Sequence, residues 1–318
     1  MADRRPVPAA APATGLRVAI VTERAGWHGA QLRRAFRARG IETRCVSLER
    51  CAIDLARGVH GIVMPGFERR LPDGVFVRGV PGGSLEQVVL RLDFLHALRE
   101  LGVAVYNDAR AIEKSVDKAM TSLLLARAGV PTPPTWVTES PARARGIVLR
   151  ETSAGRAVVV KPLFGSQGKG LLRLQAGMDI PDAAAVQGVW YLQRYVEPAA
   201  GEGRWCDWRV LVVGAAVAAA MVRHGRTWIN NVARGARCEA AAPDATLHAL
   251  AVAAARAVGM DYAGVDIMRD PGGGYQVIEV NSIPAWRGLQ SVTDSNIAEG
   301  LVNDFVSRRL TARLAAVG

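Results

Sequence analysis

The chain has 318 residues, of which 50% are hydrophobic, and this is enough for a large core divided over two or three layered domains. Aromatic residues at 6% and charged residues at 22% exclude a disordered or coiled-coil protein. No apolar run reaches the roughly 20 residues of a membrane-spanning helix, and the Ala- and Pro-rich start has no apolar signal-peptide centre. We therefore expect a cytoplasmic protein without membrane contact, beginning with a disordered tail at residues 1–15.

The formal net charge of +11 does not indicate nucleic-acid binding, because the basic residues are scattered along the chain and are not interleaved with aromatic ones. Only four of the 40 basic residues are lysines, at positions 114, 118, 161 and 169. A lysine retained in so arginine-rich a chain indicates a place where a compact ammonium serves better than a planar guanidinium, especially against phosphate oxygens. The four cysteines have no metal-binding spacing and are expected to be free thiols in a reducing compartment.

The first third of the chain alternates apolar runs of strand length with helical patterns, which predicts a parallel sheet covered by helices on both faces. The expected strands are 16–22, 41–47, 61–65 and 103–106, and the expected helices are about 28–39 and 84–101. We expect this N-terminal α/β domain to occupy residues 16–113.

The second part, 114–318, has mostly antiparallel strand patterns and is expected to be an α+β domain. The expected strands are 157–161, 170–174, 190–196, 207–213, 216–223, 262–269 and 275–280, and the expected helices are 114–128, 245–258 and about 297–314. The fold class predicted for the whole chain is therefore α/β followed by α+β.

The last two strand patterns flank a Pro-Gly-Gly-Gly turn composition, which predicts a β-hairpin. If the turn centres after Gly272, Asp266 and Glu279 lie directly opposite each other. Asn281 shares the face of Glu279, because side chains alternate along a strand. Three oxygen donors without His or Cys suit Mg²⁺, which takes further ligands from water and substrate phosphates. The alternative is an ordinary polar hairpin face, although two opposed carboxylates repel each other unless a cation lies between them.

The segment VVVKPLFGSQGKG at 158–170 places Lys161 at the end of a strand pattern, before a glycine-rich loop. Glycines let backbone N–H groups turn around phosphate oxygens, and Ser166 and lysine add hydrogen-bond donors. The loop is not a Walker A loop, since GKS or GKT does not end it and a strand pattern follows. Glycine-rich turns between strands are also common without a ligand, so a phosphate role and a plain turn both stay open.

Three further cations have two interpretations each. Lys118 lies on a helix pattern, where an exposed lysine is the ordinary case. Arg209 and Arg223 lie in strand patterns, and Arg223 follows an apolar run, so we expect it to point inward or into a cleft. An arginine placed in this way either pairs with a carboxylate or binds an anionic ligand.

Together these features resemble the ATP-grasp ligases, and more narrowly the RimK-like amino-acid ligases that add glutamate to an acceptor carboxylate. The resemblance covers about residues 16 to 314 and implies a pre-ATP-grasp domain followed by an ATP-grasp domain at 114–318, with a central lid subdomain at about 130–196. It rests on five segments in order: SVDKAMTSLLLARAGVPTPPT (115–135), VVVKPLFGSQGKG (158–170), LQRYV (192–196), CDWRVLVVG (206–214) and GVDIM…VIEVNSIPAW (264–286).

By position, the resemblance implies that Lys118 and Lys161 bind ATP phosphates and that Arg223 stabilises an acyl-phosphate and its transition state. Backbone groups of Arg194 and Tyr195, in the hinge segment 192–196, are expected to face adenine. The further residues expected at the nucleotide are Gly165, Ser166, Gln167, Gly168, Gln193, Arg194, Tyr195, Val196, Asp207, Asn230 and Asn231. The residues expected to bind Mg²⁺, or Mn²⁺ in its place, are Asp266, Glu279 and Asn281.

The resemblance implies an ADP-forming ligase in which an acceptor carboxylate attacks the γ-phosphate of ATP and the amine of L-glutamate then displaces phosphate. The segment 76–121 is most similar to ligases linked to tetrahydromethanopterin and related one-carbon cofactors. This implies a small anionic acceptor such as a tetrahydromethanopterin-type or methylofuran-type precursor. No nucleic acid is implied as a partner, and a homo-oligomer stays open.

The chain departs from the family pattern in three places. The segment EPAAGEGRW is inserted before Asp207, Ile229 stands where the family often has an arginine, and Ala285 stands where it usually has glycine. Arg226 is a candidate to replace the missing arginine. These departures leave ATP use intact and concern the acceptor pocket.

Arg78, Arg209 and Arg287 are the candidate substrate residues. Arg78 ends a strand pattern of the first domain, where parallel sheets expose ligands, and Arg287 follows the expected metal ligands. An arginine fork matches a carboxylate of the acceptor or of glutamate. The alternative is that Arg78 and Arg287 are surface residues of an arginine-rich chain.

Two other kinds of function stay open at this stage. One is a different ATP-grasp reaction, such as a ligase that modifies a protein C-terminus or joins another amino acid, or a carboxylase-like step. The other is a non-catalytic nucleotide-binding regulatory module, against which the intact set of lysines and metal-binding residues argues. ADP release measured with each amino acid distinguishes the first, and ADP release as such distinguishes the second.

Overall fold

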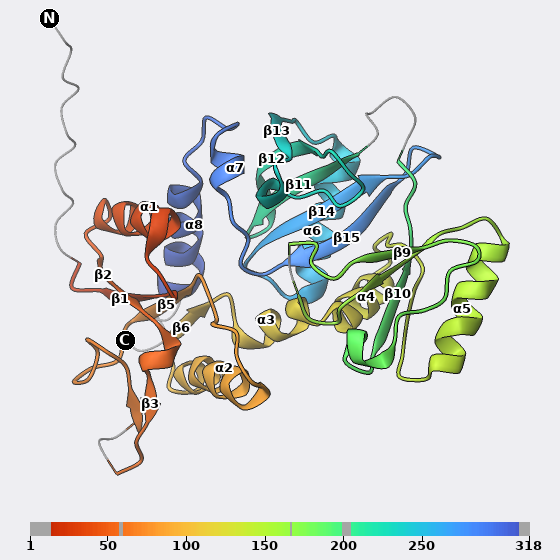
Figure 1. Ribbon diagram of the computed structural model, residues 1–318. Coiled ribbons are helices and arrows are strands. Elements are labelled where there is room, and N and C mark those ends of the chain that lie inside the picture. Colours follow the sequence, from red (N-terminus) through yellow and green to blue (C-terminus); the bar gives the residue numbers. More distant parts are fainter. Residues whose placement is uncertain (1–13, 57–59, 166, 199–204, 312–318) are drawn as a thin grey trace, which may run out of the picture. The chain divides into compact units, whose positions relative to one another are not determined.

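The computed structural model describes residues 14–56, 60–165, 167–198 and 205–311 (Figure 1). They form two compact units: one runs up to Ala109 and includes the described residues from Asn296 onward, and the other is Arg110–Ser295. The expected tail at 1–15 lies outside the described residues apart from its last two positions. No described helix has the length and apolar character needed to cross a membrane.

The first unit contains a parallel four-stranded sheet with the order β2-β1-β5-β6, which confirms the predicted N-terminal parallel sheet. Its strands are β1 (Arg17–Val21), β2 (Glu42–Val46), β5 (Gly74–Val77) and β6 (Ala104–Tyr106). Its helices are α1 (Gly26–Arg37), α2 (Leu85–Glu100) and α8 (Ile297–Phe305), with a short 3-10 turn η1 (Leu48–Arg50). Right-handed crossovers that run in opposite directions from the middle of the sheet place α1 and α2 on opposite faces.

An aromatic cluster fills this sheet's core where α8 packs beside α1 (Figure 1). Phe305 of α8 makes ring contacts with Phe36, Phe76 and Tyr106, at centroid distances between 5.3 and 5.9 Å. Gly74 makes this packing possible, since an added Cβ would lie 2.6 Å from the Phe305 ring. Helix α8, near the end of the described residues, is therefore part of the core of the first unit.

The predicted strand at 61–65 does not join the parallel sheet. Its central residues form β4 (Ile62–Val63), which pairs antiparallel with β3 (Ala52–Ile53) in a separate two-stranded sheet. The third parallel strand is β5, all four residues of which are buried. A short apolar run does not by itself tell which of two neighbouring segments enters a sheet, and here the longer buried run does.

In the second unit, an antiparallel four-stranded sheet has the order β7-β10-β8-β9. Its strands are β7 (Thr135–Thr138), β8 (Val158–Lys161), β9 (Leu172–Leu174) and β10 (Trp190–Arg194), with a 3-10 turn η2 (Ala183–Val186). Helix α5 (Pro141–Ser153) packs against it through Ile147 and Val148, which join the core of Val158, Val160 and Leu192.

A second antiparallel sheet of this unit has five strands in the order β13-β12-β11-β14-β15. They are β11 (Cys206–Val213), β12 (Ala216–His224), β13 (Arg237–Ala240), β14 (Tyr262–Arg269) and β15 (Tyr275–Asn281). Helix α6 (Ala245–Val258) lies along the sheet and buries small side chains at Ala251, Ala254 and Ala255, which let the helix approach closely. The short elements η3 (Val232–Arg234) and α7 (Arg287–Gln290) also belong to this unit.

Two predicted helices have different limits in the structure. The helix expected at 114–128 is divided into α3 (Ala109–Val116) and α4 (Lys118–Arg127), because Asp117 caps α4 by accepting hydrogen bonds from the N–H groups of Ala119 and Met120 at 2.8 and 3.1 Å. The helix expected at 297–314 is α8 followed by a π-helical turn at Val306–Leu310. Residues 312–314 lie outside the described chain.

Candidate active site

The β14–β15 hairpin pairs Asp266 with Glu279, as predicted. The route to this pairing differs, however, because the turn is centred on Gly272, with Arg269 opposite Tyr275. A bulge between Asp266 and Ile267 on the ladder accommodates one extra residue of β15 and restores the opposition of the two carboxylates. The cavity described below is lined by both Ile278 and Glu279, as expected where a bulge interrupts the alternation of side chains.

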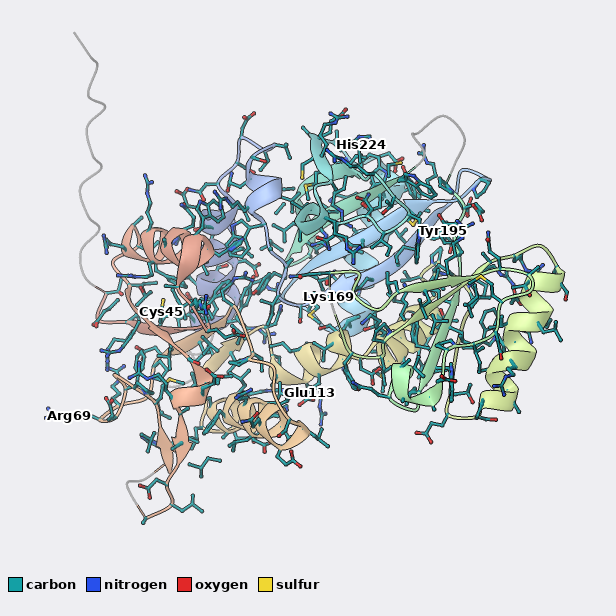
Figure 2. The ribbon with its side chains drawn as sticks, in the orientation of Figure 1. Cys45, Arg69, Glu113, Lys169, Tyr195 and His224 are labelled. Carbon is teal, nitrogen blue, oxygen red and sulfur yellow. The ribbon has the colours of Figure 1, made fainter. Side chains whose placement is uncertain are left out.

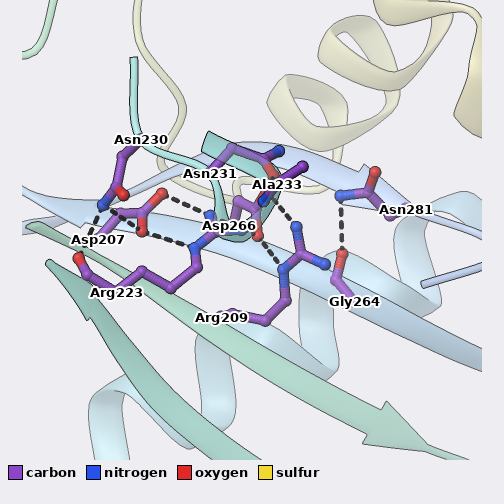
Figure 3. Close-up of polar contacts among 9 residues, drawn as sticks. All are labelled: Asp207, Arg209, Arg223, Asn230, Asn231, Ala233, Gly264, Asp266 and Asn281. Atoms are coloured by element: carbon purple, nitrogen blue, oxygen red, sulfur yellow. Dashed lines mark hydrogen bonds and ion pairs between the residues drawn. The ribbon is translucent and has the colours of Figure 1, made fainter. Parts of the chain in front are cut away.

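Two arginines and two aspartates form a row across β12, β11 and β14 (Figure 3). Arg223 binds Asp207 through two nitrogens at 2.8 and 2.5 Å, and Arg209 forms a bidentate pair with Asp266 on the neighbouring strand. Arg223 also reaches Asp266 at 3.2 Å. Burial disfavours the charged form of Asp266, but the two guanidinium groups hold the pKa of its carboxyl below the usual value. Asp266 is therefore ionised at neutral pH.

Asparagines extend this network. Asn230 donates to Asp207 Oδ1 at 3.0 Å and to the Arg223 carbonyl at 2.7 Å, so its side chain fixes the segment after β12 to the row (Figure 3). Asn231 instead accepts from the N–H of Ala233 at 2.8 Å and so caps η3. The structure thus gives the two adjacent asparagines different local partners.

Two lysines approach the row from other elements. Lys161, the last residue of β8, donates to Gln193 Oε1 at 2.6 Å, and Lys118, the first residue of α4, donates to the Gly165 carbonyl at 2.9 Å. Burial is the largest effect on both groups: it lowers the pKa of Lys118 and lowers the pKa of Lys161 to about 8, against the attraction of Glu279. A phosphate would relieve this penalty by favouring the charged ammonium.

The predicted metal set is compatible with Mg²⁺. Among the described residues, the Glu279 carboxylate has no hydrogen bond or ion pair, and burial together with the nearby Asp266 raises its pKa. A divalent cation would favour the ionised form. Asp266 has arginine partners, but a carboxylate offers about four acceptor positions and keeps capacity for a metal. With Asn281 the set contains two carboxylates and one amide, and the described residues hold no group of three His, Cys, Asp or Glu side chains suited to a metal.

One cavity of the second unit unites these groups. Every described residue predicted for the nucleotide, the metal or the transition state lines it, as does Arg209. These residues are Lys118, Lys161, Gly165, Gln167, Gly168, Gln193, Arg194, Tyr195, Val196, Asp207, Arg209, Arg223, Asn230, Asn231, Asp266, Glu279 and Asn281. Ser166 lies outside the described residues.

The apolar walls of this cavity were not predicted from the sequence. Trp205, Trp228, Ile229 and Met268 line it, and the Tyr195 and Trp228 rings meet edge to face at a centroid distance of 6.1 Å. Lys169 lines it too, and Figure 2 labels it together with Tyr195. Three of the four lysines of the chain therefore line one cavity. The retention of lysine in an arginine-rich chain was the sequence signal that could have included Lys169.

Two cationic side chains hold the glycine-rich loop between β8 and β9. Lys118 bonds to it from α4, and Arg234 of η3 donates to the carbonyls of Gln167 and Gly168 at 3.4 and 3.0 Å. Gly168 has a φ of +66°, and a Cβ added there would lie 2.4 Å from the Ile229 side chain. Glycine is required at this position both for the backbone conformation and for the close contact.

We expect Gly168→Ala to raise the KM for ATP by about tenfold or more, because the left-handed conformation and the clash together displace the loop from the cavity wall. Gly177→Ala is a matched control: its φ is +81°, but nothing lies within 4 Å of the added Cβ. The control is expected to lose some stability and to keep the wild-type KM. Nucleotide-dependent ADP release measures both, and equal KM values in the two variants would contradict the role of the contact with Ile229.

Arg78 and Arg287, the other two candidate substrate arginines, are not among the described residues that line this cavity. Arg78 follows β5 in the first unit, where its N–H donates to the Val21 carbonyl at 2.7 Å. Arg287 begins α7 in the second unit and its side chain is exposed. Their placement at a common substrate site stays a prediction.

Comparison with known proteins identifies the family. Residues 115–305 match the RimK-like ATP-grasp domain, and residues 16–112 match the RimK PreATP-grasp domain. The chain belongs to the RimK-like ATP-grasp family. As a member of this family it is an ATP-grasp ligase, and the predicted fold class is confirmed.

Two relatives with assigned names are alpha-L-glutamate ligases. The chain is 34% identical over 242 residues to a tetrahydromethanopterin:alpha-L-glutamate ligase of Methanocaldococcus jannaschii, a match that covers 74% of this chain and 79% of the relative. It is 31% identical to a probable alpha-L-glutamate ligase of Halorhodospira halophila, with 87% and 90% of the two chains covered.

Solved ATP-grasp structures share the fold. The ligase PsnB complexed with its minimal precursor superposes with a TM-score of 0.70 at 22% identity, covering 92% of this chain and 99% of that chain. The D-cycloserine synthetase DcsG gives a TM-score of 0.69, also at 22% identity, covering 92% and 99%. At this level of identity the RimK-like chain shares an architecture with them, and their substrates say nothing about its own.

Proposed function

We propose that the protein is an ATP- and Mg²⁺-dependent carboxylate–amine ligase that adds L-glutamate to a small anionic acceptor. The observation that carries the proposal is the cavity in which Lys118, Lys161, Arg223 and the pair Asp266–Glu279 come together. These side chains combine cations suited to phosphate oxygens with carboxylates suited to a hard divalent metal. The apolar wall beside Tyr195 and Trp228 suits a purine base.

In this proposal the residues of the row have distinct roles. Asp266, Glu279 and Asn281 would hold Mg²⁺, which when bound neutralises phosphate charge and orients the γ-phosphate. Lys161 and Lys118 bind phosphate oxygens of ATP. The acceptor carboxylate attacks the γ-phosphorus, ADP leaves, and an acyl-phosphate results. The amine of glutamate then attacks the acyl carbon, loses a proton and expels phosphate, which forms the amide.

Charge stabilisation is the main catalytic contribution of the protein in this reaction. Negative charge collects first on the transferred phosphoryl group. It then collects on the oxygen of the tetrahedral intermediate that forms when the amine attacks the acyl carbon. Hydrogen-bond donors that are already held in place therefore lower the activation barrier of both steps. Arg223 is held by Asp207 and Asp266, is buried with 3% of its side chain exposed, and therefore needs little reorganisation. The glycine-rich loop, tied by Lys118 and Arg234, would exclude water that hydrolyses the acyl-phosphate.

Relatives support glutamate as the amine substrate. The matching ligases of Methanocaldococcus jannaschii and Halorhodospira halophila are both named for alpha-L-glutamate. The acceptor named for the first is tetrahydromethanopterin, a small molecule. We propose an acceptor of the same chemical class, a one-carbon cofactor precursor with carboxylates, such as a tetrahydromethanopterin-type or methylofuran-type compound.

An ADP-release screen tests the proposal. Purified protein is incubated with ATP, Mg²⁺, each amino acid and a panel of anionic acceptors that includes pterin cofactors and peptides with free C-termini. Release that needs both glutamate and a small acceptor supports the proposal. ADP release with peptides alone would mean that the acceptor is a peptide, and ADP release with another amino acid would mean that glutamate is not the amine substrate. ATP binding without any ADP release would indicate a regulatory module.

Two arginines are expected to affect substrates other than ATP. Arg78→Ala and Arg287→Ala should each raise the KM for acceptor or glutamate by about tenfold, the loss expected when a charged hydrogen bond to a carboxylate is removed. The KM for ATP should stay at the wild-type value, because neither side chain lines the described cavity. Initial rates of ADP release give all three constants. Unchanged constants for every substrate would exclude both residues from the substrate site.

A further inference from the structure

The side chain of Gln193 connects strand β10, which leads into the hinge segment expected at adenine, with Lys161, the lysine proposed to bind phosphate. Gln193 is in β10, directly before Arg194 and Tyr195, and only 2% of it is exposed. Its Oε1 accepts from Lys161 Nζ at 2.6 Å. Its Nε2 donates to Thr135 Oγ1 at 3.0 Å and to Tyr191 Oη at 3.2 Å. Both the oxygen and the nitrogen of the amide are therefore hydrogen-bonded to side chains, and one of these side chains is Lys161, which is proposed to bind phosphate.

The orientation of the amide follows from the chemistry of its partners. An ammonium group has donors only, so the atom that faces Lys161 must be the amide oxygen. The amide nitrogen then faces two hydroxyl groups, which can accept. Thr135 Oγ1 donates onward to the Pro133 carbonyl at 2.8 Å, and Tyr191 Oη lies 2.8 Å from Ser122 Oγ of α4. The amide is thus fixed from β7, β10 and α4, and it fixes the ammonium in turn.

The backbone register explains how Gln193 of β10 reaches Lys161 of β8. In the antiparallel β8–β10 pair, Tyr191 lies opposite Lys161, and Gln193 lies opposite Val159. Gln193 is therefore the diagonal neighbour of Lys161 on the same face of the sheet. A lysine has a flexible stem and loses side-chain entropy when it is held in one place. A neutral acceptor at 2.6 Å holds it without neutralising it.

We propose that Gln193 is a positioning residue of the ligase: it aims the Lys161 ammonium at the phosphates and sustains its charge in the buried cavity. This rests on the proposed function, since it assumes that Lys161 meets ATP. Gln193 acts through Lys161 and is not required to touch the nucleotide itself. The strand that carries the adenine hinge and the lysine that binds phosphate are then coupled by one amide.

The charged surroundings of Lys161 define what an altered Gln193 would change. Glu279 of β15 and Asp266 of β14 favour its charged form, while Lys118 of α4 and burial disfavour it. The Tyr191 ring of β10 lies 5.9 Å from the ammonium. Because burial already outweighs these attractions, loss of the amide acceptor lowers the proton affinity of Lys161 further. A carboxylate in place of the amide raises it.

Two variants test the proposal by ATP binding at several pH values. Gln193→Leu should weaken ATP binding by about tenfold or more, and the pH above which binding declines should fall by about one unit. Gln193→Glu keeps an acceptor and adds a charge, so the decline should move to higher pH by about one unit or more. Ser122→Ala is the matched control, because Ser122 touches the same network only through Tyr191 and should leave the pH profile unchanged.

The outcomes separate a positioning role from a structural one. Opposite pH shifts in the two variants, with thermal stability close to the wild type, support the proposal. Equal weakening in both variants with the wild-type pH profile would mean that Gln193 only supports the sheet, which overturns it. ATP binding by the wild type together with unchanged binding by Gln193→Leu would overturn the role of Gln193 alone. Absence of ATP binding by the wild type would overturn the proposed function as well.

Discussion

Glu279→Gln is expected to lower the rate of ADP release by at least about 100-fold, because the variant keeps the size of the side chain but removes a charge from the metal set. The position lies opposite Asp266 in the hairpin. Without its charge the cation would be held less firmly, and the phosphate charge that develops in the transition state would lose part of its stabilisation. The measurement is ADP release at saturating ATP with Mg²⁺ varied, where the Mg²⁺ dependence should also shift to higher concentration.

Folding of this variant should be unimpaired. Burial raises the pKa of Glu279 above that of the unfolded chain, so ionisation of this group opposes folding at neutral pH. Glutamine removes that penalty, and the midpoint of thermal unfolding should stay equal or rise. Glu239→Gln on β13 is the matched control, since this carboxylate is exposed and pairs with Arg237 at 2.9 Å. ADP release by Glu279→Gln at the level of this control would exclude Glu279 from the metal set.

The hairpin illustrates what the sequence can predict. Alternation along strands and equal distance from a turn predicted the pair Asp266–Glu279, and the pairing is correct. The turn itself was placed half a residue away from its real centre, and the bulge at Ile278 compensates. A bulge has no residue signature in this strand, so it could not be predicted. The spacing was sufficient for the pair because the ladder must bring these buried side chains to one face.

Two other features that were not predicted, helix α5 and the division between α3 and α4, have recognisable signals in the sequence. Helix α5 begins with Ser140 as its N-cap and Pro141 as its first residue, which is a regular start pattern. Asp117 is likewise a capping residue in the middle of a helical run, and it divides α3 from α4. Strand β13 is different, since its residues Arg237–Ala240 are mostly exposed and lack an apolar alternation. Only its partner β12 makes it a strand.

The electrostatic network was beyond sequence reasoning for a physical reason. The sequence identified Asp207, Arg209, Arg223 and Asp266 as candidates one by one. The Arg209–Asp266 pair depends on the register between β11 and β14, which are far apart in the chain, and the Asp207–Arg223 pair depends on a register shift between Leu211 and Val212 in the β11–β12 hairpin. The lysines are the opposite case: composition alone marked them, and three of the four line the cavity. Composition can therefore reveal a site when one residue type is rare in the chain and is retained mainly where its chemistry is needed.

Lys161→Arg is the direct test of that argument. We expect ATP affinity to fall by about tenfold or more although the charge is retained, because the guanidinium is larger and planar and its donors point in other directions. The space is tight, since the ammonium is bonded to Gln193 Oε1 at 2.6 Å. Lys114→Arg replaces a lysine that is not among the described residues lining the cavity and is the matched control, expected to bind ATP nearly as the wild type does. Equal affinities in all three proteins would contradict the retained-lysine argument.

The pH dependence of the same variant gives a second, independent result. Burial lowers the pKa of Lys161 to about 8 in the nucleotide-free protein, so the group is charged below this pH and loses its proton above it. Phosphate binds the charged form, and the wild-type affinity for ATP should therefore decline above about pH 8, by up to tenfold for each further unit. Arginine stays protonated throughout, so Lys161→Arg should bind more weakly at neutral pH but decline less steeply above about pH 8 than the wild type does. If the variant and the wild type decline in parallel, a group other than Lys161 titrates at the phosphate site.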